Sequence, residues 1–197
     1  QMQIKDDGWR GYMVSKQAMN PAHPGSRFTI GSLDTLNGDV GADLKTFFAA
    51  HYSADQMGAV ILGTETLDEL EARVAPLLGQ VANNDLGPTA PDVPLFTAAQ
   101  LPAQLASVSL KNTVKIAYNF PMPNTLPVYR NKPERYITNL LGHEGSGSLH
   151  SELTARGWIE SLSAGTDQFD QATAVLSINM ELTDAGRQNI PQISDLV

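Results

Sequence analysis

Histidine and carboxylate side chains offer the clearest potential for chemistry in this sequence, because it contains four histidines and no cysteine. His143 and His150 lie close in sequence to Glu144 and Glu152, as metal ligands on a helix would. A zinc-binding helix needs its two histidines at i, i+4 spacing so that both imidazoles leave the same face. His143 and His150 are separated instead by a glycine-rich break. We therefore interpret them as hydrogen-bonding residues and predict no metal site in this chain.

The other candidate motifs predict structure more than chemistry. His23 and His51 stand in separate segments without a nearby ligand pattern. The glycine-rich stretch 142–147 is not followed by the Gly-Lys-Ser/Thr of a phosphate loop, which disfavours nucleotide binding. Its glycines permit an abrupt turn between two helices, and Ser148 can cap the second of these. Ser and Asp residues are scattered, so no Ser-His-Asp arrangement can be argued from sequence.

Composition excludes several classes of partner. The 197 residues are 42% hydrophobic and 17% charged, which is typical of a folded globular protein. A formal net charge of -8 and the lack of a basic patch predict no nucleic-acid partner. The apolar runs are far shorter than the ~20 residues that span a bilayer, so we expect no membrane insertion. The sequence starts at Gln1 without a signal-like segment, and we expect it to be a piece of a longer protein.

Apolar spacing predicts the elements of the first half: helices over 4–19, 44–52 and 67–81, and a strand over 57–63. Thr66 precedes the third helix as a capping residue, with acidic residues in the following turn. Phe47 and Phe48 are expected to point inward. The run 57–63 is too short for a helix and predicts a buried strand.

A proline-containing stretch of low periodicity, residues 88–106, predicts a linker. Beyond it, alternating apolar residues predict a strand over 113–120 that Pro121 and Pro123 terminate. The remaining expected elements are helices over 134–141 and 148–156, the latter ended by Gly157, strands over 158–165 and 173–182, and a further helix capped by Thr183.

Several motifs occur in one order along nearly the whole chain: Asn20-Pro-Ala-His-Pro24, Leu67-Asp-Glu-Leu70, Leu141-Gly-His-Glu-Gly-Ser-Gly-Ser-Leu149, Gly157-Trp158 and Leu162-Ser-Ala-Gly165. Each motif alone is weak, but their shared order and spacing are specific. In these motifs the sequence resembles the pitrilysin/insulinase family of zinc metallopeptidases.

The resemblance implies an α+β fold with helices packed on antiparallel-rich sheets, in parts of two homologous metallopeptidase-type domains. Residues 1–87 would form the C-terminal part of the catalytic-type domain. Residues 88–106 would be the linker, and residues 107–197 would begin the second, non-catalytic domain.

The family holds zinc with an HxxEH helix and a later glutamate, and none of these ligands is found in this sequence. The resemblance thus implies a parent zinc endopeptidase whose zinc lies outside this chain. It implies no catalytic residue and no cofactor here, and no cleavage by the chain alone. The alternative is a non-catalytic peptide-binding or partner subunit of the same superfamily.

The resemblance also implies a substrate-binding surface, at which a peptide adds as an extra strand. Trp9 and Tyr12 would line the cleft near the metal or pack in the core. The expected partners are a peptide substrate and the remaining domains of the parent, in the periplasm or, alternatively, the cytoplasm. The candidate substrate-binding residues are Gly142, His143, Glu144, Ser163, Ala164 and Gly165.

Overall fold

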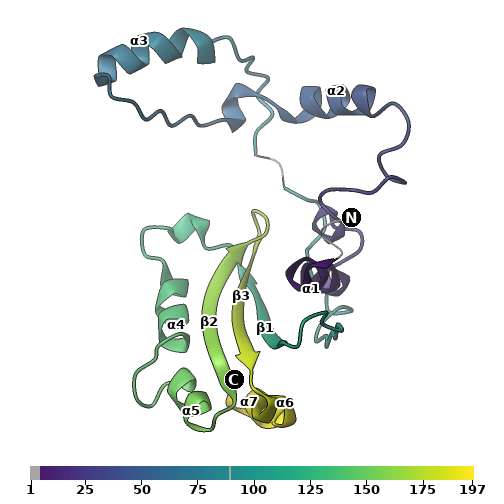
Figure 1. Ribbon diagram of the computed structural model, residues 1–197. Coiled ribbons are helices and arrows are strands. Elements are labelled where there is room, and N and C mark those ends of the chain that lie inside the picture. Colours follow the sequence, from purple (N-terminus) through teal and green to yellow (C-terminus); the bar gives the residue numbers. More distant parts are fainter. Residues whose placement is uncertain (1–4, 89) are drawn as a thin grey trace. The chain divides into compact units, whose positions relative to one another are not determined.

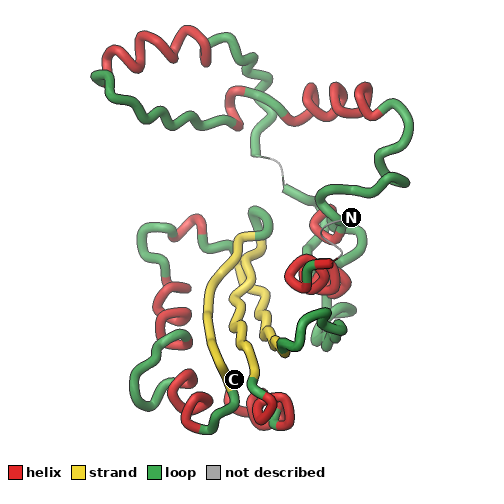
Figure 2. Tube along the Cα trace, viewed as in Figure 1, coloured by secondary structure: helices red, strands yellow, loops and turns green. Residues whose placement is uncertain are grey.

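The computed structural model describes residues 5–88 and 90–197, which group into two units. The larger unit combines Gln1–Thr29 with Pro91–Val197, and the smaller one is Ile30–Ala90. Figure 1 labels their elements, and Figure 2 shows that all three strands belong to the larger unit. The architecture is α+β, as predicted.

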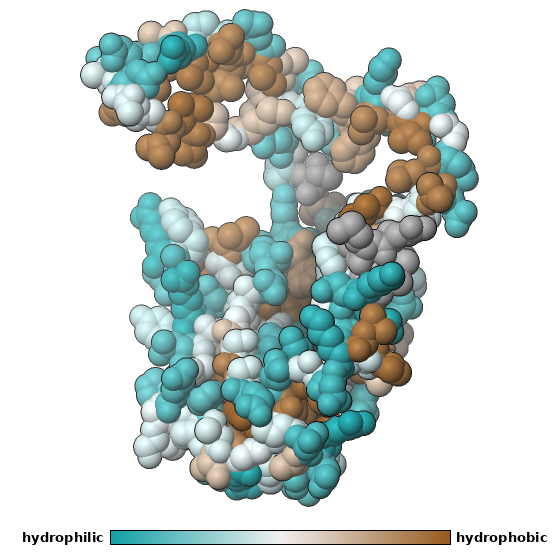
Figure 3. Space-filling model, in the orientation of Figure 1, coloured by the Kyte–Doolittle hydropathy of each residue, from teal (hydrophilic) through white to brown (hydrophobic). Residues whose placement is uncertain are grey.

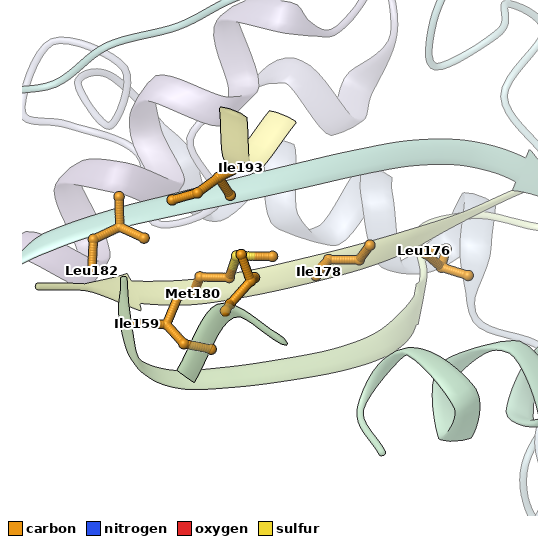
Figure 4. Packing of buried hydrophobic residues seen from close by; sticks show 7 residues of the cluster. Ile159, Leu176, Ile178, Met180, Leu182 and Ile193 are labelled. Carbon is orange, nitrogen blue, oxygen red and sulfur yellow. The ribbon is translucent and has the colours of Figure 1, made fainter. Parts of the chain in front are cut away.

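The larger unit is built on an antiparallel sheet of β1 (Val114–Pro123), β2 (Ile159–Gln168) and β3 (Thr173–Leu182), in the order β1-β3-β2. β3 is central because both neighbours pair with it. Its alternating residues Leu176, Ile178, Met180 and Leu182 are buried on one face, as the period of a strand requires (Figure 4).

Four short helices accompany this sheet: α4 (Pro133–Leu141), α5 (Leu149–Ala155), α6 (Asp184–Gln188) and α7 (Ile190–Leu196). Helices α4 and α5 contact β2 (Figure 1). Leu153 of α5 and Ile193 of α7 are both completely buried in the cluster formed by β3. The apolar side chains of the sheet thus have a core of their own within this unit.

The predicted starts of two helices and the predicted end of one strand can be compared with the structure. Ser148 and Thr183 cap α5 and α6, each accepting a backbone N–H with its hydroxyl, as predicted. The prediction that the strand ends at the prolines was wrong for Pro121, since β1 continues through it, whereas Pro123 is the last residue of β1. Within the described residues β1 pairs with β3 alone, and prolines two apart lack their N–H on the same side, so an edge strand tolerates both.

Helix α1 (Asp7–Ser15) is attached to the segment that precedes β1. The Asp7 carboxylate accepts hydrogen bonds from the backbone N–H of Leu110 (2.8 Å) and Lys111 (2.9 Å) and from the Ser109 hydroxyl (2.8 Å). These donors lower the pKa of Asp7. Arg10 donates to the carbonyl of Val108 at 3.0 Å. The helix of the N-terminal segment is therefore fixed to residues far along the chain.

The smaller unit contains α2 (Val40–His51) and α3 (Leu67–Leu78), and most of its apolar side chains are exposed. Apolar residues gather around α3 in Figure 3. The expectation that Phe47 and Phe48 point inward was wrong, because 53% and 59% of their surfaces are exposed. The Phe48 ring instead stacks on the ring of Tyr52, and the Phe47 ring packs against His51 at an interplanar angle of 42°.

The predicted strand over 57–63 is not formed, although Figure 2 shows the segment before α3 as an extended loop. Val60 and Leu62 are 97% and 98% exposed. A strand is defined by hydrogen bonds to a neighbour, and the described residues offer this segment none. The prediction of a buried strand was therefore wrong for residues 57–63, which are all exposed and have no partner strand among the described residues.

Local polar contacts order the ends of the smaller unit. Thr66 and Glu69 form a capping box at α3, and the Thr66 hydroxyl and N–H lower the pKa of Glu69. Ser53 is fully buried, accepts the N–H of Asn84 at 2.8 Å and donates to Asp55. The Ser53 hydroxyl, then the Gln56 side chain and the Gly87 N–H, hold the pKa of Asp55 well below its ordinary value.

The first prediction concerns Gly186. A methyl group at this position would overlap the carbonyl of Trp158, so α6 must move away from the start of β2. Gly186→Ala should lower the free energy of unfolding by about 2 kcal/mol or more, measured by thermal or urea denaturation. Gly11→Ala is the control, because a methyl group there meets nothing within 4 Å. Equal melting temperatures for the two variants would contradict this packing.

The second prediction concerns the pH dependence of Asp55. Its pKa is lower in the folded chain than the ordinary 3.8, so the stabilisation by its carboxylate is complete above that pH and disappears at lower pH. The amide NMR shift of Gly87, which donates to Asp55 at 2.8 Å, should therefore change only below pH 3.8. Ser53→Ala should raise the midpoint. A wild-type midpoint at or above 3.8 would argue against the contact.

Candidate functional site

The β2 edge carries three of the predicted site residues. Ser163, Ala164 and Gly165 lie in the middle of β2, opposite Asn179, Ile178 and Ser177 of β3. Ala164 shares the core face with Ile178, whereas Ser163 and Gly165 are exposed on the other face. Within the described residues β2 pairs only with β3. The N–H and C=O groups along its other edge thus lack a partner strand there.

Gly142 lies beside this strand, directly after α4. A Cβ atom on Gly142 would stand 3.9 Å from the backbone N of Ala164 and 3.2 Å from the carbonyl O of Thr138. The structure therefore brings Gly142 and Ala164 together, although they belong to separate motifs. Glycine is suited to this position because any larger side chain would extend toward the backbone of β2.

His143 folds back over the loop that begins at Gly142. Its Nδ1 accepts the backbone N–H of Gly145 at 3.0 Å, and a methyl group on Gly145 would overlap the imidazole ring. A neutral ring whose Nδ1 accepts carries its proton on Nε2. His143 and Glu144 are both exposed. The loop therefore presents an N–H donor and a carboxylate next to each other.

A zinc ion does not fit the donor sets of the described residues. Across residues 5–88 and 90–197, no group of three or more His, Asp or Glu side chains is placed to hold a metal ion. His143 lies in the loop after α4, whereas His150 belongs to α5. No chemistry through zinc is therefore derived from these residues.

A shallow hollow of about 400 Å³ lies beside α1. Trp9 and Tyr12 contribute aromatic walls with ring centroids 5.9 Å apart, and Asp6 adds a carboxylate that caps the helix. Trp9 remains 38% exposed. Gly8 and Thr29 complete the lining. The two aromatic residues singled out in the sequence thus share one partly open surface.

His23 makes a polar contact with Asp170 that the sequence did not predict. It is 3% exposed, and its Nε2 lies 3.2 Å from Oδ2 of Asp170 in the turn between β2 and β3. The two residues are so far apart in sequence that no spacing pattern connects them. The only sequence signal was the position of His23 within Asn20-Pro-Ala-His-Pro24.

Comparison with known proteins places this geometry in a family. The model of the Peptidase M16 inactive domain matches residues 40–197. Insulin-degrading enzyme of Homo sapiens is 32% identical over 198 residues, which cover 96% of this chain and 19% of that protein. Protease 3 of Escherichia coli (strain K12) is 34% identical over 192 residues, which cover 95% of this chain and 20% of that protein.

A solved structure agrees with these sequence matches. The crystal structure of pitrilysin superimposes with a TM-score of 0.85 and 32% identity, covering 99% of this chain and 21% of that one. This chain spans about a fifth of the length of these relatives. The resemblance stated from the motifs is confirmed, and the chain belongs to the Peptidase M16 inactive-domain family of pitrilysin/insulinase-type proteins.

Proposed function

We propose that this chain is part of a zinc-dependent endopeptidase of the pitrilysin/insulinase type, in which it supplies scaffold and part of the wall that binds the peptide. The observation that carries the proposal is the unpaired edge of β2 with Gly142 beside it. Relatives named insulin-degrading enzyme and Protease 3 support a proteolytic parent. The zinc ligands belong to another part of that parent, since the described residues of this chain offer none.

A peptide binds to β2 by backbone pairing. An extended segment added to a sheet edge exchanges N–H···O=C bonds with the strand, which requires no particular side-chain sequence. Ser163 and Gly165 are small and exposed, so they leave room for the peptide side chains on the open face. Ala164 fixes the register because its side chain belongs to the core face.

The loop beside β2 orients the end of that peptide. His143 directs an Nε2–H donor, since its Nδ1 is engaged by Gly145, and this donor suits a peptide carbonyl oxygen. Glu144 provides a carboxylate for a positively charged group, such as a free amino terminus. Gly142, His143, Glu144, Ser163, Ala164 and Gly165 thus form one proposed binding surface.

The remaining domains of the parent are the second proposed partner. Residues 57–63 are extended and apolar on both faces, as a central strand would be, and lack a neighbouring strand in the described chain. The exposed apolar residues of α2 and α3 would also be buried by contact with another protein surface. We assign both to contact with another part of the parent. The domain limits at 1–87, 88–106 and 107–197 are proposed from the family resemblance, and they differ from the two compact units, which join Gln1–Thr29 to Pro91–Val197.

A non-catalytic partner subunit is the second candidate function. It is favoured by the match to a domain described as inactive. An HxxEH motif elsewhere in the parent would support the enzyme, and its loss would support the partner subunit.

The periplasm is the proposed location, with the cytoplasm as the alternative. One relative is named as peroxisomal. None of the described helices is both long and apolar enough to cross a bilayer.

The third prediction tests the binding surface. Gly142→Val places methyl groups between the loop and Ala164 and should raise the Kd of a short fluorescein-labelled peptide with a free amino terminus about tenfold, measured by fluorescence anisotropy. Ser146→Val is the matched control, because it adds the same side chain at an exposed position of the same loop. Equal affinity of the two variants would argue against binding at Gly142 and β2.

The fourth prediction separates binding from catalysis. The 197-residue chain should bind no stoichiometric zinc and should not cleave a quenched fluorescent peptide, with or without added zinc. Metal content and fluorescence increase are the measurements. Zinc-dependent turnover that a chelator abolishes would contradict the proposal and would direct attention to His143, Glu144 and His150.

A further inference from the structure

The turn between β2 and β3 is held by a residue from the opposite end of the sequence. Asp170 lies in this turn, and only 8% of its side chain is exposed. Its Oδ1 accepts the backbone N–H of Ala172 (2.7 Å) and of Thr173 (2.6 Å), which shapes the turn. Its Oδ2 lies 3.2 Å from Nε2 of His23. One carboxylate thus both closes the hairpin and contacts the N-terminal segment.

His23 is held rigidly from its other side. Its Nδ1 accepts the N–H of Gly25 at 2.9 Å, which leaves the proton of a neutral ring on Nε2, facing Asp170. The contact is close but is not aligned as a hydrogen bond. Buried Lys16 donates to the carbonyl of Gly25 and lies over the Tyr12 ring, 4.7 Å from its centroid. The orientation of the His23 ring is therefore set by contacts other than the one with Asp170.

The segment around His23 is itself attached to the rest of the larger unit. Asn20 donates its backbone N–H to the carbonyl of Leu95 at 2.8 Å and its side-chain amide to the carbonyl of Pro94 at 2.9 Å. Leu95 is 1% exposed and would be in contact with a methyl group on Gly25. The His23–Asp170 contact therefore joins the hairpin to an ordered anchor rather than to a loose tail.

We infer that His23 is a positioning residue for the peptide-binding edge of β2, acting through Asp170 at the tip of the β2–β3 hairpin. Within the described residues β2 has a strand neighbour on one side only, so its position depends on the β3 ladder and the turn at its end, together with the contacts of α4 and α5. The inference rests on the proposed function. His23 need not touch the peptide, because it sets the course of the strand with which the peptide pairs.

The test uses the full 197-residue chain and a substitution that removes one contact alone. His23→Asn retains a side-chain oxygen able to accept the Gly25 N–H and removes the ring nitrogen that faces Asp170. Asp170→Asn retains the oxygen that caps the turn and removes the charge. The double variant completes a cycle. His51→Asn, at an exposed histidine of α2, is the matched control.

The structure of each variant is followed by hydrogen exchange at the Phe169 and Thr173 amides and by the NMR shifts of Ser163 to Gly165. Its binding is followed by the Kd of the labelled peptide. The His23→Asn substitution should accelerate exchange of these amides about tenfold, shift the β2 resonances and raise the Kd of the peptide about fivefold. The double variant should be no worse than the more affected single variant. The control should match wild type in both measurements.

Opposite results would overturn the inference. Wild-type exchange and wild-type β2 shifts in His23→Asn would show that the histidine does not position the hairpin. If the effects of the two substitutions on exchange and on peptide affinity add, His23 does not act through Asp170. If the peptide affinity of the variants follows only their melting temperatures, His23 contributes to packing and does not position β2. If wild-type chain binds no peptide, the proposed function fails, while exchange and shifts still decide whether His23 positions β2.

Discussion

Backbone pairing along β3 is the interaction on which the larger unit depends. β3 has a neighbour on each side, and its alternate residues supply the core that Leu153 and Ile193 complete. Pairing on both sides satisfies the N–H and C=O groups of this strand and leaves β1 and β2 as edges. The edge of β1 contains two prolines, which cannot donate. The edge of β2 has no proline, so each backbone N–H that faces this edge can donate to another strand.

The same constraint explains the smaller unit. Its extended segment 57–63 has apolar residues on both faces but no neighbour in the described chain, and α2 and α3 expose their apolar sides. Polar contacts, such as those of Ser53 and Thr66, order the local structure without burying a core. The smaller unit thus contains many apolar side chains of the kind found in protein interiors, and most of them are exposed. The proposed contact with other parts of a larger protein would account for both.

Local signals in the sequence predicted most elements, because caps and periodicity act over a few residues. Ser148, Thr66 and Thr183 cap helices as expected, and the alternation in 173–182 marks the central strand. The failures involve partners that a local pattern cannot contain. Phe47 and Phe48 lie on a helix without a covering surface, and residues 57–63 lack a ladder. Similarly, the contact between His23 and Asp170 joins distant segments. The motifs contained the candidate site residues, whereas the adjacency of Gly142 and Ala164 was visible only in the structure.

The central claim is that the free edge of β2 binds an extended peptide by backbone pairing. The most direct measurement is hydrogen exchange of the backbone amides from Ser163 to Gly165, recorded with and without a saturating unlabelled peptide. Exchange should slow along this edge, while the exposed amides around Val60 and Leu62 exchange as before. Binding of the peptide with unchanged exchange along β2 would rule out pairing at this edge and would place the peptide elsewhere on the chain.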